Sequence, residues 1–242
     1  VQFTPDVLPS DIVGFSLYDK ATGKFVYKPG AVMTNLLLAD EINRTSSKTQ
    51  SALLEAMEER QTTVDGTTYK LPEPFIVIAT QNPVGAAGTQ LLPQAQLDRF
   101  MVKLNMGYPD HKSQIDILKD RQTEDPIANV KTVCSAEDII KLQEQAKNVE
   151  MSDSLLEYVT DLSEKSRKHP LVTLGISPRG ALAVCKMAKA KALTDKRNYV
   201  IPSDITDVFT DVCSHRIILS AKARINDTSA GDVLKEISDE VK

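Results

Sequence analysis

One short segment constrains the fold of this chain more than any other. Residues 36–39 are all aliphatic, and two adjacent acids, Asp40 and Glu41, follow them directly. An unbroken apolar run of this length is typical of a strand covered on both faces, as in a parallel sheet. Ligands bind such sheets at the carboxyl ends of the strands, where an Asp can hold the water shell of a phosphate-bound Mg²⁺ and a Glu can polarise an attacking water. The segment therefore predicts an α/β fold that hydrolyses a nucleotide, although the acidic pair taken alone could be a solvated strand end.

The character of the chain changes near residue 108. Before it, further apolar runs at residues 75–80 and 102–106 predict two more strands of a parallel α/β sheet. After Pro109 the apolar spacing is helical. We therefore expect an α/β core over residues 1–108 and an all-helical domain over residues 109–242, with a polar tail from Asn226 that frays. The apolar positions that mark the expected helices of the second domain are Ile139, Leu142 and Ala146, then Leu155, Val159 and Leu162, then Ala181, Leu182, Cys185 and Ala188, and finally Ile205, Val208, Phe209 and Val212.

Two hairpins and a helix are predicted inside the first domain. Asp65-Gly66 lies between β-prone residues, which is the strongest short hairpin signal. Residues 16–27 form a weaker second case, turning near Gly23. Between the acidic pair and the first of these hairpins, Ser47 and Gln50 fit a capping box that opens a helix with an apolar stripe. The hairpins carry no obvious catalytic side chain, so they are either edge decoration or contacts to a substrate or neighbouring subunit.

Composition narrows the class of protein. The 242 residues are 41% hydrophobic and 26% charged, as in a soluble globular protein of one or two domains, and the net charge of −4 gives no general attraction to nucleic acid. No apolar stretch is long enough to span a membrane, and the first residues do not form a signal peptide, so the expected compartment is the cytoplasm. The three cysteines and three histidines are scattered, which argues against disulfides and against a zinc site.

Three further residues are candidates for the same chemistry. Asn82 follows residues 75–80 and would place a neutral amide near the acidic pair, although Asn in this setting is also a common turn residue. Arg99 ends a short predicted helix, where it is either a surface ion-pair partner or a guanidinium that reaches a phosphoryl group across an interface. Arg179 lies in the first turn of a helix opened by Pro178, where a cation is disfavoured unless an anion lies close by.

A phosphate-binding loop is missing from this set. Such a loop needs a Gly-Lys pair followed by Ser or Thr, and the only Gly-Lys pair here, Gly23-Lys24, is followed by Phe25. The remaining motifs nevertheless occur in a specific order. They are residues 36–44, 48–59, 79–83, 95–100 and 177–179. In this order, and over nearly the whole chain, they resemble the MoxR family of AAA+ ATPases.

The resemblance implies a role for each candidate residue. Asp40 and Glu41 would be the Walker B acids, with Asp40 at the Mg²⁺ ion and Glu41 activating water. Asn82 would be the sensor 1 residue. Arg99 would be an arginine finger that acts on the ATP of a neighbouring subunit, whereas Arg179 would be the sensor 2 residue of the lid and act on the ATP of its own subunit.

The resemblance also implies partners. It suggests a homo-oligomeric ring, most often a hexamer, with Arg44 at the interface and both hairpins facing a central pore. It suggests a client protein, one candidate being a protein with a von Willebrand factor A-type domain. ATP hydrolysis would then drive chaperone-like remodelling or maturation of that client. A metal-chelatase AAA+ subunit would share almost every motif, and a fragment unable to use ATP, acting only as an interaction module, is a further alternative.

Two departures from the family pattern concern the loop and the beginning of the chain. Residues 84–88 lack the acids that family members carry after their Asn-Pro, and residues 90–91 replace a more usual aromatic-Pro pair. Family members carry the Walker A segment upstream of a strand that residues 2–6 resemble, so we expect this chain to lack its beginning. The central strand leading into that segment would lie between the expected strands 102–106 and 75–80.

Overall fold

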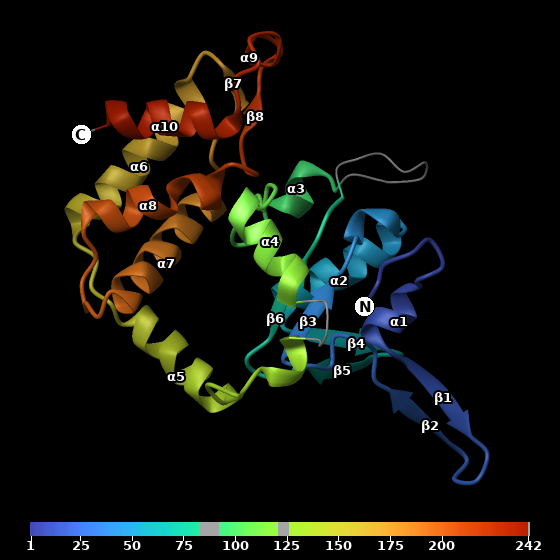
Figure 1. The fold of residues 1–242 in the computed structure, drawn as a ribbon. Coiled ribbons are helices and arrows are strands. Elements are labelled where there is room, and N and C mark those ends of the chain that lie inside the picture. Colours follow the sequence, from blue (N-terminus) through green and yellow to red (C-terminus); the bar gives the residue numbers. More distant parts are fainter. Residues whose placement is uncertain (83–91, 121–125, 242) are drawn as a thin grey trace.

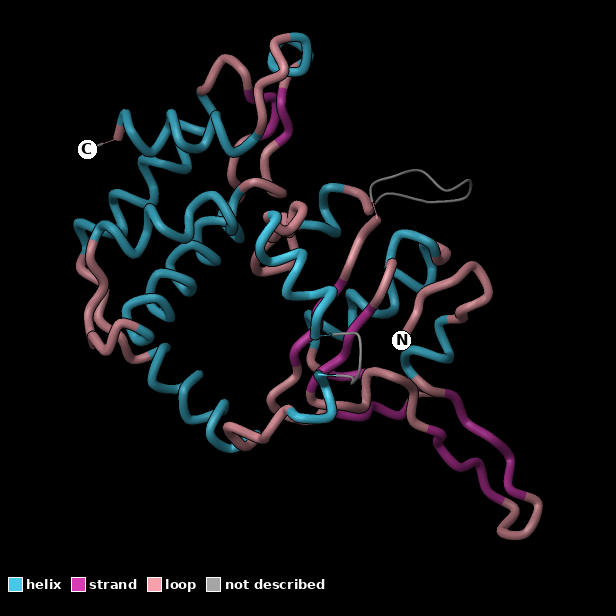
Figure 2. The backbone as a smooth tube through the Cα atoms, in the orientation of Figure 1, coloured by secondary structure: helices cyan, strands magenta, loops and turns pink. Residues whose placement is uncertain are grey.

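The structure, a computed structural model, describes residues 1–82, 92–120 and 126–241. Most strands lie in the first half of the chain and most long helices in the second half (Figures 1 and 2). The first half holds α1 (Pro9–Val13), β1 (Phe15–Asp19), β2 (Lys24–Lys28), β3 (Leu36–Ala39), η1 (Ile42–Arg44), α2 (Ser47–Glu59), β4 (Gln61–Val64), β5 (Thr67–Lys70), β6 (Ile76–Ala79) and α3 (Gln94–Leu97). It is followed by α4 (His111–Asp120), η2 (Pro126–Asn129), α5 (Ala136–Lys147), α6 (Asp153–Lys168), β7 (Val172–Leu174), α7 (Pro178–Thr194), α8 (Pro202–Cys213), β8 (Ile218–Leu219), α9 (Ala221–Ile225) and α10 (Ala230–Glu240).

The predicted parallel strands form the centre of the first half. β3 pairs with β6 in parallel, from Leu36 opposite Ile76 to Ala39 opposite Ala79. Among the described residues, the sheet is covered on one face only: Ala39 is buried together with side chains of α1 and α2, whereas Leu36 is 58% exposed. The expectation of a sheet covered on both faces is therefore wrong for this chain, since both packed helices lie on the same side.

The third predicted strand does not form. Residues 102–106 have no strand partner within the described part of the chain. A strand needs a neighbouring ladder of backbone groups, and here the Lys103 N–H donates instead to the carbonyl oxygen of Asp211 in α8, at 2.9 Å. Val102 packs against the helical half, while Met106 is 92% exposed. The segment thus connects the two halves rather than extending the sheet.

The helix after the acidic pair is present, with its cap one residue earlier than predicted. Ser46, not Ser47, is the N-cap of α2, and its hydroxyl accepts from the Thr49 N–H at 3.3 Å. Gln50 is buried, and its amide donates to the Ile42 carbonyl oxygen at 3.1 Å instead of reaching back to the cap. Leu53 is fully buried in the core of the first half. α2 is therefore held against the segment that follows Glu41.

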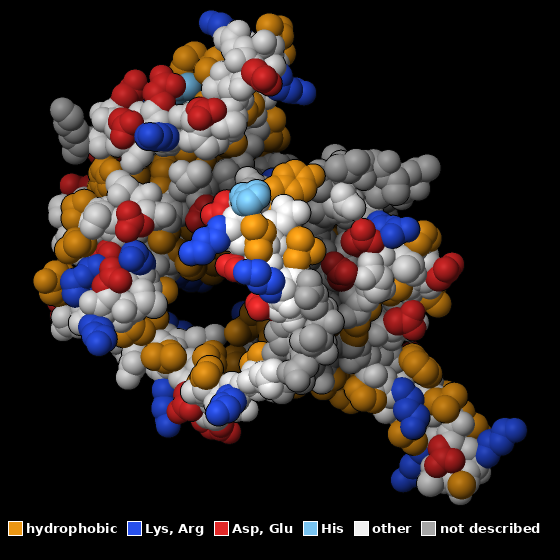
Figure 3. Space-filling view, viewed as in Figure 1, with side chains coloured by type: hydrophobic (Ala, Val, Ile, Leu, Met, Phe, Trp, Pro, Cys, Tyr) orange, Lys and Arg blue, Asp and Glu red, His pale blue; other side chains and the backbone are white. Residues whose placement is uncertain are grey.

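Both predicted hairpins form and contact each other. β4 pairs with β5 through Asp65 and Gly66, which both have positive φ, as a type I′ turn requires. β1 pairs with β2, and this hairpin projects from the molecule (Figure 1). The rings of Tyr27 and Tyr69 stack at 3.8 Å and join the two hairpins. Apolar side chains gather along the projecting hairpin, and Phe25 near its tip is 74% exposed (Figure 3).

The helical half has its own hydrophobic core, contributed by α6, α7, α8 and α10. The predicted stripe on α7 is partly wrong, because Leu182 is 62% exposed while Ala183 and Val184 are buried. The tail does not fray as predicted, since α10 buries Leu234 and Ile237 completely. The half is not entirely helical either, because the short strands β7 and β8 pair. None of the helices in the described ranges is long and apolar enough to cross a membrane.

Candidate functional site

The acidic pair lies where the sequence predicts, at the carboxyl end of β3. Its neighbour across the sheet is Thr80, which follows β6 and whose hydroxyl donates to Oδ1 of Asp40 at 2.5 Å. The same hydroxyl oxygen accepts from the N–H of Glu41 at 2.8 Å, and the Thr80 carbonyl oxygen accepts from the N–H of Ile42 at 3.0 Å. The parallel register makes this contact possible, because Asp40 and Thr80 each come one residue after the last paired residue of their strands. The two strand ends thus form one polar edge.

The Glu41 carboxylate is held by two partners. Its Oε2 accepts from Nε2 of Gln2 at 2.9 Å and pairs with Nη1 of Arg44 at 2.8 Å. The Glu41 backbone has a φ of 53°, in the left-handed region that a residue with a side chain seldom adopts. This turn leads the chain from β3 directly into η1, and strain of this kind is concentrated at functional sites. The side chain stays 22% exposed, so Glu41 is oriented yet open to solvent.

Asn82 lies near this edge, held through its backbone. Nδ2 of the fully buried Asn43 donates to the Asn82 carbonyl oxygen at 3.1 Å, and Oδ1 of Asn43 accepts from the Asn82 N–H at 3.4 Å. Asn43 follows the acidic pair by two residues. The structure therefore ties the segment after β6 to the segment after β3, in addition to the hydrogen bond from Thr80 to Asp40.

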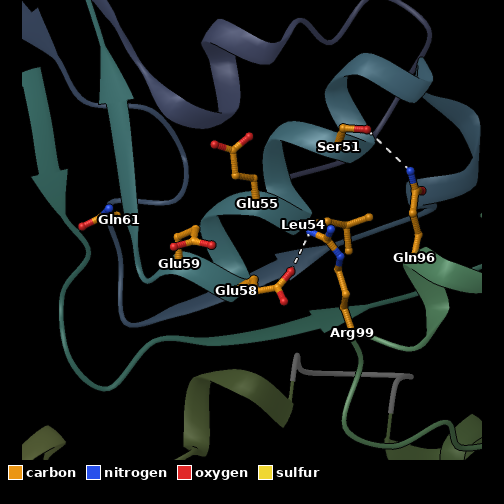
Figure 4. Close-up of a pocket in the computed structure, with 8 residues that line it drawn as sticks. All are labelled: Ser51, Leu54, Glu55, Glu58, Glu59, Gln61, Gln96 and Arg99. Carbon is orange, nitrogen blue, oxygen red and sulfur yellow. Dashed lines mark hydrogen bonds and ion pairs between the residues drawn. The ribbon is translucent and has the colours of Figure 1, made fainter. Parts of the chain in front are cut away.

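Arg99 and Arg179 form a second cluster. Both pair with Glu58 in the last turn of α2: Nη1 of Arg99 lies 3.1 Å from Oε2, and Nη2 of Arg179 donates to Oε1. Arg99 comes from the residues after α3 and Arg179 from the first turn of α7, so three separate elements meet at one carboxylate. Figure 4 shows Arg99 reaching toward Glu58 along α2. Beside them lies a groove of about 470 Å³, lined by Ser51, Leu54, Glu55, Glu58, Glu59, Gln61, Gln96 and Arg99.

The two clusters lie at opposite ends of α2. Gln50, near the start of the helix, contacts Ile42 beside the acidic pair, whereas Glu58 is in the last turn. At a rise of 1.5 Å per residue, Glu58 lies roughly 12 Å from Gln50 along the helix axis. The structure therefore does not bring Arg179 to Asp40 as the sequence led us to expect. It places Arg179 beside Arg99, because both side chains pair with Glu58 in the last turn of α2.

A buried junction lies directly behind the two arginines. Asp98 accepts from the hydroxyl of Ser177 at 3.0 Å and from Nε of Arg216 at 2.8 Å. The Arg216 side chain is 2% exposed, and it also donates to the carbonyl oxygens of Phe100 at 2.7 Å and Met101 at 3.1 Å. Burial lowers the pKa of Arg216, opposed by the nearby Asp98 carboxylate. The junction thus joins the residue before Arg99 to the N-cap of α7.

Close packing completes the junction. A Cβ at Gly180 would lie 2.8 Å from Cγ2 of Ile176 and 3.0 Å from Cδ of Arg216, so the aliphatic stem of Arg216 rests where a side chain on α7 would collide with it. The Ser177 hydroxyl also accepts from the Gly180 N–H at 3.1 Å, which caps α7. Ser177 therefore acts both as a helix cap and as a contact between the two halves.

Comparison with known proteins identifies the family. Residues 1–102 match the ATPase family associated with various cellular activities (AAA), and residues 164–237 match an AAA lid domain. The uncharacterized protein YeaC of Bacillus subtilis (strain 168) is 50% identical over 242 residues, covering 100% of this chain and 76% of YeaC. Chaperone MoxR1 of Mycobacterium tuberculosis (strain ATCC 25618 / H37Rv) is 39% identical over 246 residues, covering 98% of this chain and 65% of MoxR1. The chain belongs to the MoxR family of AAA+ ATPases.

The fold agrees with this assignment. A presumed ATPase of Cytophaga hutchinsonii ATCC 33406 has a solved structure that matches with a TM-score of 0.90 at 38% identity, covering 100% of this chain and 76% of that one. This MoxR-family chain thus has the AAA+ architecture, an α/β part with parallel strands followed by a helical part. A magnesium-chelatase subunit ChlI homolog of Methanocaldococcus jannaschii (strain ATCC 43067 / DSM 2661 / JAL-1 / JCM 10045 / NBRC 100440) matches more weakly, at 29% identity over 194 residues.

Several residues of the MoxR site were not found by sequence reasoning. Thr80 could have been found, because equal positions after two parallel strands lie opposite each other. Glu58 and Asp98 fall inside motifs, residues 48–59 and 95–100, that were noted for their likeness to the family. Arg216 lies in no motif, and nothing local to its sequence indicates that its charge is buried. The loop residues 83–91, including Pro83 and the departures from the family pattern, lie outside the described residues.

Proposed function

We propose that this protein hydrolyses ATP within a ring of identical subunits and uses the energy to remodel or mature a client protein. One observation carries the proposal: Asp40 and Glu41 end β3 at a polar edge that Thr80 of the neighbouring parallel strand completes. This is the edge of an α/β sheet where ligands bind. The division into a nucleotide-binding core over residues 1–108 and a lid over residues 109–242 belongs to the same proposal, supported by two separate hydrophobic cores.

The residues at this edge fit a magnesium ion. Mg²⁺ prefers oxygen ligands and is usually bound through one or two carboxylates together with waters and substrate phosphates. The Asp40 carboxylate and the Thr80 hydroxyl are oxygen donors of this kind, 2.5 Å apart. We assign Asp40 to hold the ion, which would neutralise phosphate charge when bound. In the described residues, no group of three or more His, Cys, Asp or Glu side chains could enclose a metal alone, so the phosphates would have to supply the remaining ligands.

Glu41 is assigned to activate the attacking water. Its carboxylate is oriented by Gln2 and Arg44 and remains partly exposed, so a water molecule can reach it. Asn82 is assigned as the sensor residue, because Asn43 fixes its backbone beside the same edge. These 242 residues contain no Gly-Lys-Ser/Thr segment to cradle the phosphates, so no step of this assignment depends on such a contact.

We assign Arg99 and Arg179 to the ATP of a neighbouring subunit. Both guanidiniums gather at the end of α2 that is remote from Asp40, and both are partly exposed, at 33% and 47%. A guanidinium supplied by a neighbour stabilises charge on the transferred phosphoryl group and is worth about 10³- to 10⁵-fold in rate. The hexameric ring, the cytoplasmic location and a client with a von Willebrand factor A-type domain are further parts of the proposal, supported by the MoxR resemblance.

Substitution of Glu41 tests the hydrolytic assignment. In the full-length protein, Glu41→Gln should lower kcat by about 10²- to 10⁴-fold, the usual contribution of a general base, while ATP still binds. Glu73→Gln, on the loop before β6, is the matched control and should hydrolyse ATP at the parent rate. A Glu41→Gln variant that turns over as fast as the parent protein contradicts the assignment.

Mixing inactive variants tests the assignment of the arginines. Arg99→Ala subunits keep Glu41, and Glu41→Gln subunits keep Arg99, so a mixed ring contains interfaces with one intact copy of each. If Arg99 acts on the neighbour, the equimolar mixture should recover about a quarter of the parent rate, because about one interface in four is complete. The Arg179→Ala variant mixed with Glu41→Gln should recover to the same extent. If one of the mixtures shows no recovery, the arginine that was substituted in it acts within its own subunit.

A further inference from the structure

Two positive charges are held side by side at the end of α2. Arg99 and Arg179 contact the two oxygens of one carboxylate, Oε2 and Oε1 of Glu58. Guanidiniums this close repel each other, and a carboxylate between them offsets the repulsion. All three side chains are a third to a half exposed, so the arrangement is open to a ligand. Glu58 therefore determines how far apart the tips of the two arginines lie.

The arrangement leaves most of the arginine donors free. Each guanidinium has five N–H donors. Arg99 uses Nη1 and Arg179 uses Nη2 for Glu58, and neither side chain has another acceptor within the described part of the chain. Both arginines can therefore stay bound to Glu58 while their remaining donors bind a phosphate group. Glu58 is thus compatible with the function proposed above for the two arginines.

The position of Arg179 makes a counter-charge necessary. It lies in the first turn of α7, where the helix dipole is positive and where this helix has no acidic residue of its own. The carboxylate of Glu58 supplies the negative charge from another element. Without it, the Arg179 side chain would be repelled by both the helix terminus and Arg99, and would turn into solvent.

The backbones behind the two arginines are fixed independently of Glu58. Asp98 precedes Arg99, and Ser177 lies two residues before Arg179; their side chains hydrogen-bond at 3.0 Å. This contact fixes the backbone positions of the two arginines. Glu58 instead fixes the positions of their guanidinium groups. The loss of Glu58 should therefore displace the guanidiniums without separating the two halves of the molecule.

Negative charge alone does not distinguish Glu58 from the other glutamates of α2. Glu55 and Glu59 lie on the same helix and line the same groove, but neither has an ion-pair partner within the described ranges. Glu58 is distinguished from them by its two contacts. Glu55 thus provides a matched control, one turn earlier on α2 and of the same chemistry.

We propose that Glu58 is a positioning residue that holds Arg99 and Arg179 together as a two-armed binding site for a phosphate group of the neighbouring subunit's ATP. The inference depends on the proposed function, because it concerns how the two arginines reach that phosphate. Glu58→Gln removes the carboxylate charge and keeps the shape of the side chain. The inference predicts that this substitution lowers the rate of hydrolysis only because the two arginines are displaced.

The test is a double-mutant cycle in the full-length protein. Glu58→Gln should lower kcat by roughly 10- to 100-fold with little change in KM, the size expected when a catalytic group is misplaced by about 1 Å, while Glu55→Gln keeps the parent kcat. In an Arg179→Ala background, Glu58→Gln should have a clearly smaller effect, because one of the two groups that it positions is already absent. A residue that only stabilises the fold would lower kcat equally in both backgrounds and would lower the melting temperature.

The outcomes separate this inference from the proposed function. If Arg99→Ala and Arg179→Ala both retain the parent kcat, the proposed function of the arginines is wrong. If those two variants lose activity but Glu58→Gln retains the parent kcat, or loses equally in both backgrounds, the arginines act as proposed and the role assigned to Glu58 is wrong.

Discussion

The strongest stability prediction concerns the buried ion pair between Asp98 and Arg216. Asp98→Ala removes the carboxylate that, among the residues the structure describes, is the one paired with the Arg216 guanidinium, at 2.8 Å; the Arg216 side chain is 2% exposed. Removing one partner of a buried pair costs about 3 to 5 kcal/mol, because the other charge remains buried without compensation. Asp98 is itself 20% exposed, and several carbonyl oxygens still accept from Arg216, so the lower end of the range, about 3 kcal/mol, applies.

A second contribution comes from Ser177, whose hydroxyl loses its acceptor on Asp98. Losing this hydrogen bond lowers the free energy of unfolding by a further amount of about 1 kcal/mol. The total loss should be about 4 kcal/mol in the free energy of unfolding. For a protein of this size, a loss of that order corresponds to a decrease of roughly 8 to 16 °C in Tm. Urea and thermal unfolding followed by circular dichroism measure both quantities.

The double variant gives the decisive comparison. Asp98→Ala combined with Arg216→Met removes both charges, so it should be at least about 2 kcal/mol more stable than the sum of the single effects predicts. Asp116→Ala on the exposed helix α4 is the control and should change stability by less than about 0.5 kcal/mol. An Asp98→Ala loss below about 1 kcal/mol, or strict additivity in the double variant, would refute the reasoning that the charge of Arg216 is buried and compensated by Asp98.

Two further predictions concern buried groups of the helical half. Burial, reinforced by the charge of Arg216, lowers the pKa of His215 to about 4 from an ordinary value near 6.5. The folded state therefore keeps His215 neutral while the unfolded state takes up a proton, so the contribution of His215 to stability is present above pH 6.5 and is lost as the pH falls toward 4. Between pH 7 and pH 5 the free energy of unfolding should decrease by about 2 kcal/mol more in the parent protein than in His215→Gln, and an equal pH dependence of the two would contradict this. Burial also raises the pKa of the Cys213 thiol to about 12, whereas Cys134 is exposed. A thiol reagent at pH 8 should modify Cys134 within minutes and Cys213 only on unfolding, and mass spectrometry showing equal rates would be inconsistent with the packing of α8.

Local sequence determined the parts of this protein that depend on neighbouring residues. The turn at Asp65 and Gly66 needs positive φ at two successive positions, a requirement that these residue types meet by themselves. The helix of α2 follows from an N-cap and an apolar stripe, both of which lie within a few residues of each other. The end of β3 before Asp40 was also predictable, because its apolar run stops at two adjacent acids. These features depend on interactions over at most a few residues, so the sequence contains them in readable form.

Tertiary packing decided which distant residues meet. Nothing near Arg179 in the sequence indicates whether it faces Asp40 or Glu58. In the folded chain it pairs with Glu58, which is 121 residues earlier. The failure of residues 102–106 to form a strand has the same origin, because a strand exists only where another segment supplies its hydrogen bonds. The burial of Arg216 likewise depends on Asp98, more than a hundred residues earlier in the chain. Long-range pairings are set by the packing of whole elements, and a local pattern holds no information about that packing.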